Sequence, residues 1–91
     1  ERISNDEEIF RVYPGLVTAG SDFVVEWYPI DGREKVRLFV MDITGKNCAE
    51  FILNNGINHL VVNNFKTGVY YLTVQDYSFH TLVKKIVVTD F

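Results

Sequence analysis

Short runs in which apolar and polar residues alternate recur along the whole chain, and the clearest lies near its middle. There, Val36, Leu38 and Val40 take every second position, which predicts a strand with one face turned inward. The run continues into Asp42-Ile43-Thr44-Gly45, a turn sequence, because Asp bonds its own backbone and Gly accepts a positive φ. An extended pattern resumes at Lys46, so the sequence predicts a β-hairpin.

Six further strands are expected from the same pattern. They cover residues 9–13, 23–27, 47–53, 58–63, 69–75 and 79–89. Turn sequences separate them: Pro14-Gly15, a hairpin signal at Asp31-Gly32, and Asn54-Asn55-Gly56, while residues 18–22 form a loop of mostly small side chains. Because no helical periodicity is present, the prediction is an all-β fold, a seven-stranded antiparallel immunoglobulin-like β-sandwich. It would comprise residues 9–91, after an N-terminal arm or linker end at residues 1–8.

The alternation also predicts which side chains form the core. In the second strand Phe23, Val25 and Trp27 share a face, and Glu26 points away from it. The other residues expected to face inward are Phe10, Val12, Ala49, Phe51, Leu53, Leu60, Val62, Tyr70, Leu72 and Val74. The last strand has apolar residues on both faces, with Leu82, Ile86 and Val88 opposed to Val83 and Val87, so the alternation does not decide which face is buried.

Composition limits the chain to one small domain and excludes several classes of function. A domain of 91 residues buries only about 60–65% of its unfolded surface, and 47% hydrophobic and 14% aromatic residues exclude a disordered chain. A net charge of −3 without a basic cluster disfavours nonspecific nucleic-acid binding. No apolar run approaches the ~18 residues that span a membrane. Glu1 begins in a polar stretch, so the chain has the appearance of an excised fragment.

The residues with chemical potential each have a simpler structural interpretation. Asp6-Glu7-Glu8 are expected to be solvated charge, and His59 and His80 lack acidic or cysteine neighbours at metal-ligand spacing. Cys48, the single cysteine, has no activating motif and cannot form an internal disulfide. Motifs of hydrolases, phosphate-binding loops and metalloproteases are absent. We therefore predict no catalytic residue, no cofactor and no metal, and no enzymatic activity.

Two binding alternatives remain open at this point. A calcium site could draw on Asp31, Asp42 or Asp76, although Asp is expected in turns in any case. A sugar-binding surface could be built from aromatic side chains, of which about half should be core residues in a sandwich. The aromatic residues considered are Tyr13, Trp27, Tyr28, Tyr70, Tyr71 and Tyr77.

Four motifs in order resemble the C-terminal sorting domain of type IX secretion cargo, known from Bacteroidetes-type Gram-negative bacteria. Residues 12–14, Val-Tyr-Pro, match an opening V-Y-P-N-P motif, although Gly15-Leu16 replaces its Asn-Pro. Residues 40–46 resemble V-Y-D-x-x-G-K, and residues 65–72 resemble L-P-x-G-V-Y-x-V. Residues 84–88 resemble the closing segment x-K-K-I-V-V. The resemblance spans about residues 10–88.

This resemblance implies a non-catalytic signal domain. It would direct its parent protein through the periplasm and the type IX outer-membrane translocon to the cell surface or the medium, before removal by a sortase. The partners implied are the translocon and the outer-membrane shuttle and sortase proteins, without membrane insertion. The resemblance also allows a second interpretation, in which the domain is a divergent copy that is retained on a component of the secretion or attachment machinery.

The same resemblance suggests which residues the translocon or sortase recognises. They are Asp42, Gly45, Lys46, Gly68, Lys84, Lys85, Ile86, Val87 and Val88. A partner strand could add to the terminal strand or to another sheet edge, and the same edges could support a homodimer. The competing readings are a generic immunoglobulin- or fibronectin-like spacer and a carbohydrate-binding or adhesion module.

Overall fold

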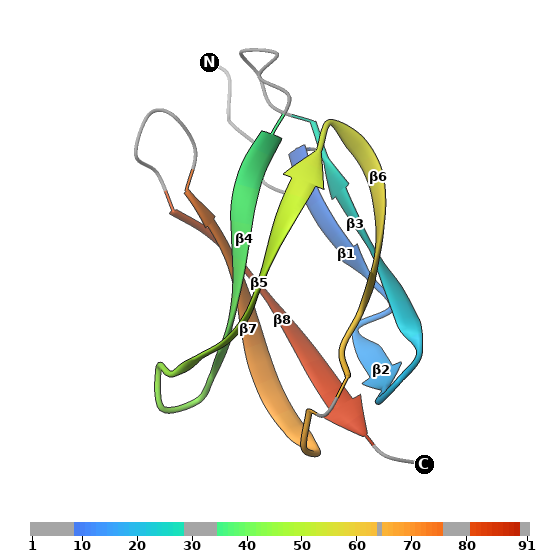
Figure 1. The fold of residues 1–91 in the computed structure, drawn as a ribbon, viewed down its shortest axis with the longest axis vertical. Helices are drawn as coiled ribbons and strands as arrows, with labels where there is room; N and C mark the ends of the chain where they lie inside the picture. The colour runs from blue at the N-terminus through green and yellow to red at the C-terminus, as the bar shows by residue number, and fades with distance from the viewer. Residues whose placement is uncertain (1–8, 29–34, 64, 76–80, 90–91) are drawn as a thin grey trace, which may run out of the picture.

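The computed structural model describes residues 9–28, 35–63, 65–75 and 81–89, which form an all-β fold of two sheets (Figure 1). The strands are β1 (Phe10–Tyr13), β2 (Leu16–Thr18), β3 (Asp22–Trp27), β4 (Lys35–Asp42), β5 (Asn47–Asn54), β6 (Gly56–Val61), β7 (Gly68–Gln75) and β8 (Thr81–Thr89). The small sheet has the order β1-β3-β6, and the large sheet has the order β2-β8-β7-β4-β5. No described helix is long and apolar enough to cross a membrane.

The described residues contain eight strands, so the predicted number of seven is wrong. The missing strand is β2, which pairs in parallel with the end of β8, whereas every other strand pair is antiparallel. The turn at Pro14-Gly15 separates β1 in the small sheet from β2 in the large sheet. Three residues are too few to show an alternating pattern, yet Val17 is fully buried and contributes to the core.

Turn sequences identified where the chain reverses but not which strands pair afterwards. The β4–β5 hairpin is confirmed. Asp31-Gly32 lies outside the described residues, but β3 and β4 belong to different sheets, so the predicted hairpin between them is wrong. The turn at Asn54-Asn55-Gly56 likewise carries the chain from the large sheet to the small sheet. The predicted arm at residues 1–8 and the turn at residues 76–78 lie outside the described residues.

The crossover from β5 to β6 is held by one buried amide side chain. Asn58 is only 7% exposed, and its Oδ1 accepts a hydrogen bond from the Asn54 N–H at 2.8 Å. Its Nδ2 lies 3.0 Å from the Asn54 carbonyl, 3.2 Å from that of Val25 and 3.3 Å from that of Gly56. One side chain thus satisfies backbone groups of the turn and also ties it to β3.

We expect Asn58→Ala to lower the free energy of unfolding by about 1–3 kcal/mol, because it leaves buried backbone groups without a partner. Urea denaturation of the purified chain measures the change. The neighbouring exposed position supplies the control: Ile57→Ala should stay within about 0.5 kcal/mol of the unaltered protein. Equal midpoints for both variants would refute the role given to Asn58.

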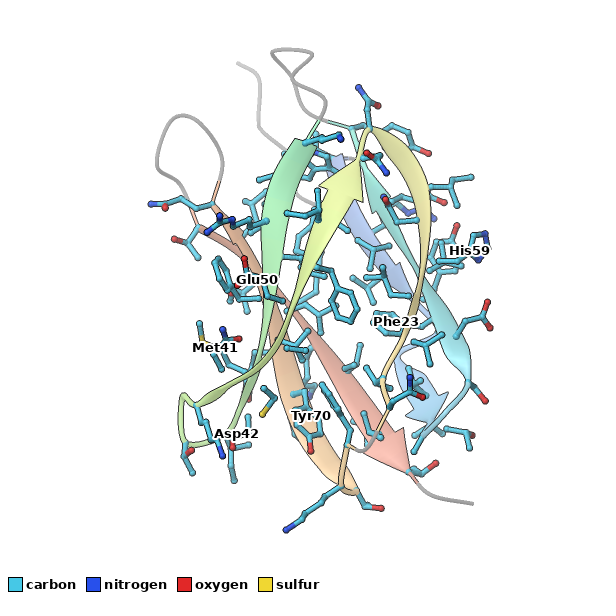
Figure 2. All side chains as sticks on the ribbon, viewed as in Figure 1. Phe23, Met41, Asp42, Glu50, His59 and Tyr70 are labelled. Atoms are coloured by element: carbon cyan, nitrogen blue, oxygen red, sulfur yellow. The ribbon has the colours of Figure 1, made fainter. Side chains whose placement is uncertain are left out.

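The core lies between the two sheets and draws on both (Figure 2). Every residue predicted to face inward is buried or packs against the buried cluster, so that prediction is confirmed. In β8 the open question is settled, because Leu82, Ile86 and Val88 are buried whereas Val83 is exposed. Figure 2 shows Phe23 and Tyr70 between the sheets, with Met41 and Glu50 on one outer side and His59 on the other.

Leu38→Ala and Tyr70→Ala should each destabilise the fold by roughly 2–4 kcal/mol, because each leaves a cavity between the sheets. The measurement is the unfolding free energy from chemical denaturation. Val83→Ala on the solvent side of β8 is the control and should have little effect. Midpoints unchanged by both core substitutions would contradict the inward placement of these side chains.

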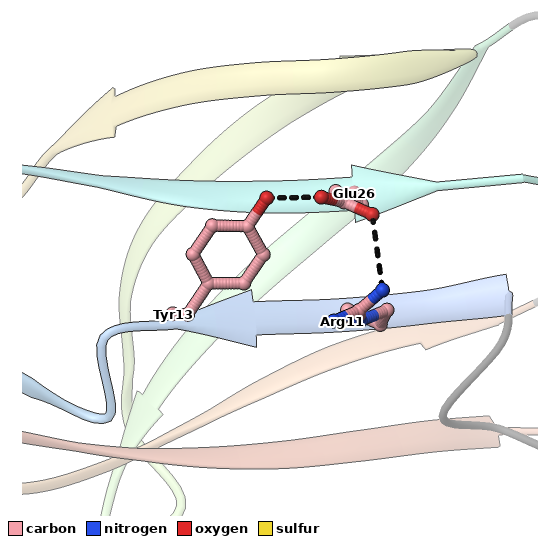
Figure 3. Close-up of polar contacts among 3 residues, drawn as sticks. All are labelled: Arg11, Tyr13 and Glu26. Carbon is pink, nitrogen blue, oxygen red and sulfur yellow. Dashed lines mark hydrogen bonds and ion pairs between the residues drawn. The ribbon is translucent and has the colours of Figure 1, made fainter.

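Glu26 points away from the core, as predicted, but it is not solvated. It is 9% exposed, because neighbouring side chains cover it (Figure 3). The Tyr13 hydroxyl donates a hydrogen bond to one carboxylate oxygen, and Arg11 Nη1 lies 3.8 Å from the other. The bond to Glu26 is the main reason that the pKa of Tyr13 is raised. The Glu26 carboxylate on the outer face of the small sheet therefore already has partners, Tyr13 and Arg11.

Candidate functional site

The turn between β4 and β5 is closed by the Asp42 side chain. Asp42 Oδ1 accepts hydrogen bonds from the Thr44 N–H at 2.9 Å, the Thr44 hydroxyl at 2.6 Å and the Lys46 N–H at 3.1 Å. Backbone bonds join Gly45 N to Asp42 O and Asp42 N to Lys46 O, each at 3.0 Å. Gly45 has φ +88°, which a side chain would strain. Asp42 and Gly45 therefore build the turn, and Lys46 leaves it with an exposed side chain.

The pKa of Asp42 is lowered from its usual 3.8, first by the hydrogen bond from the Thr44 hydroxyl. A carboxyl group with a depressed folded pKa stabilises the turn at neutral pH and loses this effect as the pH falls through that lowered value. We expect Thr44→Ala to raise the pKa of Asp42 toward 3.8, and an NMR titration of the Asp42 carboxyl resonance measures it. Ile43→Ala, at an exposed turn position, is the control. Identical titration curves for Thr44→Ala and the unaltered chain would refute the assignment.

The corner that leads into β7 lies beside this hairpin, because the strand register pairs Asp42 with Tyr70. The Tyr70 hydroxyl donates to the Lys66 carbonyl at 2.8 Å, and its ring centroid lies 4.8 Å from that of Phe65. Burial is the main cause that raises the pKa of Tyr70. Between hairpin and corner is an open hollow of about 460 Å³. Its lining residues are Asp42, Lys46, Cys48, Asn63, Phe65, Lys66 and Tyr70.

The end of β8 reaches the same end of the molecule, where Val88 pairs with Gly68. Its backbone is already occupied on both sides, because β7 lies on one side and β2 on the other. The Val87 N–H donates to the Gly15 carbonyl at 2.8 Å, and the Ala19 N–H donates to the Thr89 carbonyl at 2.7 Å. Addition of a partner strand to residues 87–89 would therefore require displacement of β2.

The predicted recognition residues lie in two parts of the large sheet, and some of them are buried. Asp42, Gly45, Lys46, Gly68 and the end of β8 come together at one end of the large sheet, here called the hairpin end. Within that set, Ile86 and Val88 are fully buried core residues, so a partner cannot contact them in the folded protein. Lys84 and Lys85 lie nearer the middle of β8: Lys84 is half-buried, and Lys85 is exposed.

Lys66 and Asn63 line the hollow together with Lys46, although neither was predicted as a site residue. Lys66 occupies a corner position and Asn63 follows a strand, so no periodic signal indicated that they would meet the hairpin. Cys48 is exposed, and its Sγ lies 3.6 Å from the Lys46 carbonyl.

The residues considered for sugar or metal binding do not form one site among the described residues. Trp27 and Tyr70 are buried, Tyr71 is exposed on the large sheet, and Tyr13 lies over Glu26 on the small sheet. Tyr77, His80, Asp31 and Asp76 lie outside the described residues. Within the described part of the chain, no three His, Cys, Asp or Glu side chains are grouped to hold a metal ion.

The sequence model of a family described as the secretion system C-terminal sorting domain matches residues 18–89. The chain belongs to this family. The match extends from the end of β2 through β8, so it contains the hairpin, the corner and the terminal strand. It does not include Val12-Tyr13-Pro14, whose resemblance to the opening motif stays a prediction. A comparison with curated proteins gave no match.

Membership carries a general functional meaning. The family implies a C-terminal sorting signal of type IX secretion, which acts with the secretion machinery and leads to export to the cell surface or into the medium. It is a family of non-catalytic signal domains, in agreement with the expectation that the chain is not an enzyme. The hairpin, the corner and the terminal strand therefore form the candidate recognition surface.

Proposed function

We propose that this domain is a folded address signal that targets its parent protein through the type IX outer-membrane translocon to the cell surface. The observation that carries the proposal is the family match over residues 18–89. The two sheets and the switch of the chain between them at Pro14-Gly15 support an immunoglobulin-like sandwich as the form in which the signal is displayed.

The hairpin end is the proposed recognition region. It gathers residues 40–46, residues 65–72 and the end of β8 (residues 86–88), which lie far apart in the chain. Exposed Gly45 and Lys46 and half-buried Gly68 and Val87 are the parts that a translocon or sortase can contact there. Side-chain recognition is favoured over strand addition at the end of β8, since β2 already pairs with that strand.

The test is export of a periplasmic reporter fused to residues 1–91, compared in a type IX-competent host and in the same host without a working translocon. We expect surface-exposed or secreted reporter only in the competent host, because export depends on the translocon. A reporter with the signal peptide alone is the control and should remain periplasmic. Equal periplasmic retention of the fusion in both hosts would favour the alternative, a spacer or a carbohydrate-binding or adhesion module.

A second fusion that lacks residues 84–91 tests the terminal strand. Its removal eliminates Ile86 and Val88 from the core, so the purified truncated domain should also be examined by circular dichroism for loss of the fold. Export of the truncated fusion at the level of the complete one would contradict the proposed function. The size of the exported complete fusion distinguishes a cleaved signal from a retained copy.

A further inference from the structure

The outer face of the large sheet carries an apolar surface, interrupted by Thr73 and Lys85 and contributed by strands far apart in the sequence. The register places Met41 beside Tyr71 and Tyr71 beside Lys85. In the adjacent row, Phe39 pairs with Thr73 and Thr73 with Val83. Tyr71 and Val83 are 38% and 48% exposed, while Phe39 and Met41 are half-buried.

The apolar surface continues toward the hairpin end. There Val69 pairs with Val87, and Val87 pairs with Leu16 of β2, which is 59% exposed. Side chains on one face of a strand alternate, so Lys85 lies between Val83 and Val87 along β8 and beside Tyr71 across to β7. Lys85 is thus an exposed cation flanked by Val83, Val87 and Tyr71.

Lys85 has no acidic partner among the described residues of this face. Glu50 is the acid on the described part of this outer face, and its carboxylate lies 3.3 Å from Arg37 Nε. By contrast, each acid on the described part of the outer face of the small sheet has a polar neighbour within the protein. Glu26 contacts Arg11 and Tyr13, and His59 Nδ1 lies 3.5 Å from Asp22 Oδ2.

We propose that the outer face of the large sheet is the docking surface for a protein of the secretion machinery, one that presents an apolar surface with a carboxylate opposite Lys85. The inference rests on the proposed function and names the chemistry of the partner. Burial of the Tyr71 and Val83 side chains supplies the apolar contribution, and a carboxylate matches the unpaired cation. A symmetric pairing of two copies through this face would bring like charges together, since Glu50, the acid on the described part of the face, already contacts Arg37.

The experiment uses the same reporter fusion in the type IX-competent host, with substitutions on the two outer faces. Val83→Ser and Lys85→Glu should each reduce the surface-exposed reporter and leave it in the periplasm. Val61→Ser is the matched control, an exposed valine on the outer face of the small sheet, and it should be exported like the unaltered fusion. Lys85→Arg keeps the charge and should also be exported.

The possible outcomes separate this inference from the function on which it rests. Retention of the unaltered fusion overturns both. Export of the unaltered fusion together with undiminished export of Val83→Ser and Lys85→Glu overturns the docking surface alone. Equal losses for Val83→Ser and Val61→Ser overturn it as well, because the effect would not be specific to this face.

Two measurements on the purified chain exclude other causes. Melting temperatures of the four variants should lie within about 5 °C of the unaltered chain, so that a loss of export reflects the surface and not the fold. Sedimentation velocity should show a monomer. A dimer that Lys85→Glu dissociates would overturn the proposal, because a second copy would then cover this face.

Discussion

The pairing of β4 with β7 in the middle of the large sheet is the contact on which the rest of the structure depends. Leu38 pairs with Val74 and Val40 pairs with Leu72, and all four side chains are completely buried. The same register continues to Asp42 and Tyr70, so it fixes the hairpin beside the corner that precedes β7. The pairing that forms the core thus also assembles the hairpin end.

The family motifs divide into residues that form the fold and residues that a partner can reach. Asp42 and Gly45 close a turn, and Ile86 and Val88 fill the core. A short motif in such a domain therefore contains residues needed for folding as well as residues available to a partner. A signal that is recognised in the folded state must first fold. The exposed residues that remain, Lys46 and Lys85 among them, are the ones to which we assign recognition in our proposal.

The two outer faces differ in a way that matters for a domain without an active site. On the described part of the small sheet, Glu26 lies beside Arg11 and Asp22 lies beside His59. The large sheet exposes an apolar surface around Lys85. A sheet can leave one face to water, so apolar residues concentrated on such a face need a further explanation, which the proposed docking partner would provide.

The sequence by itself determined the all-β class, the central hairpin and the inward faces, because strand periodicity and turn chemistry are local properties. It could not reveal β2, since three residues show no period and their stability comes from pairing with the distant end of β8. It also could not tell the β4–β5 hairpin from the crossover at Asn54–Gly56, because each turn combines an Asp or Asn with a following glycine. Tertiary structure alone decided that Val87 is paired on both sides, that Lys66 meets Lys46 at one hollow, and that Lys85 lies within an apolar surface. Each of these depends on which strands become neighbours, a choice made by burial across the whole chain and not by any single segment.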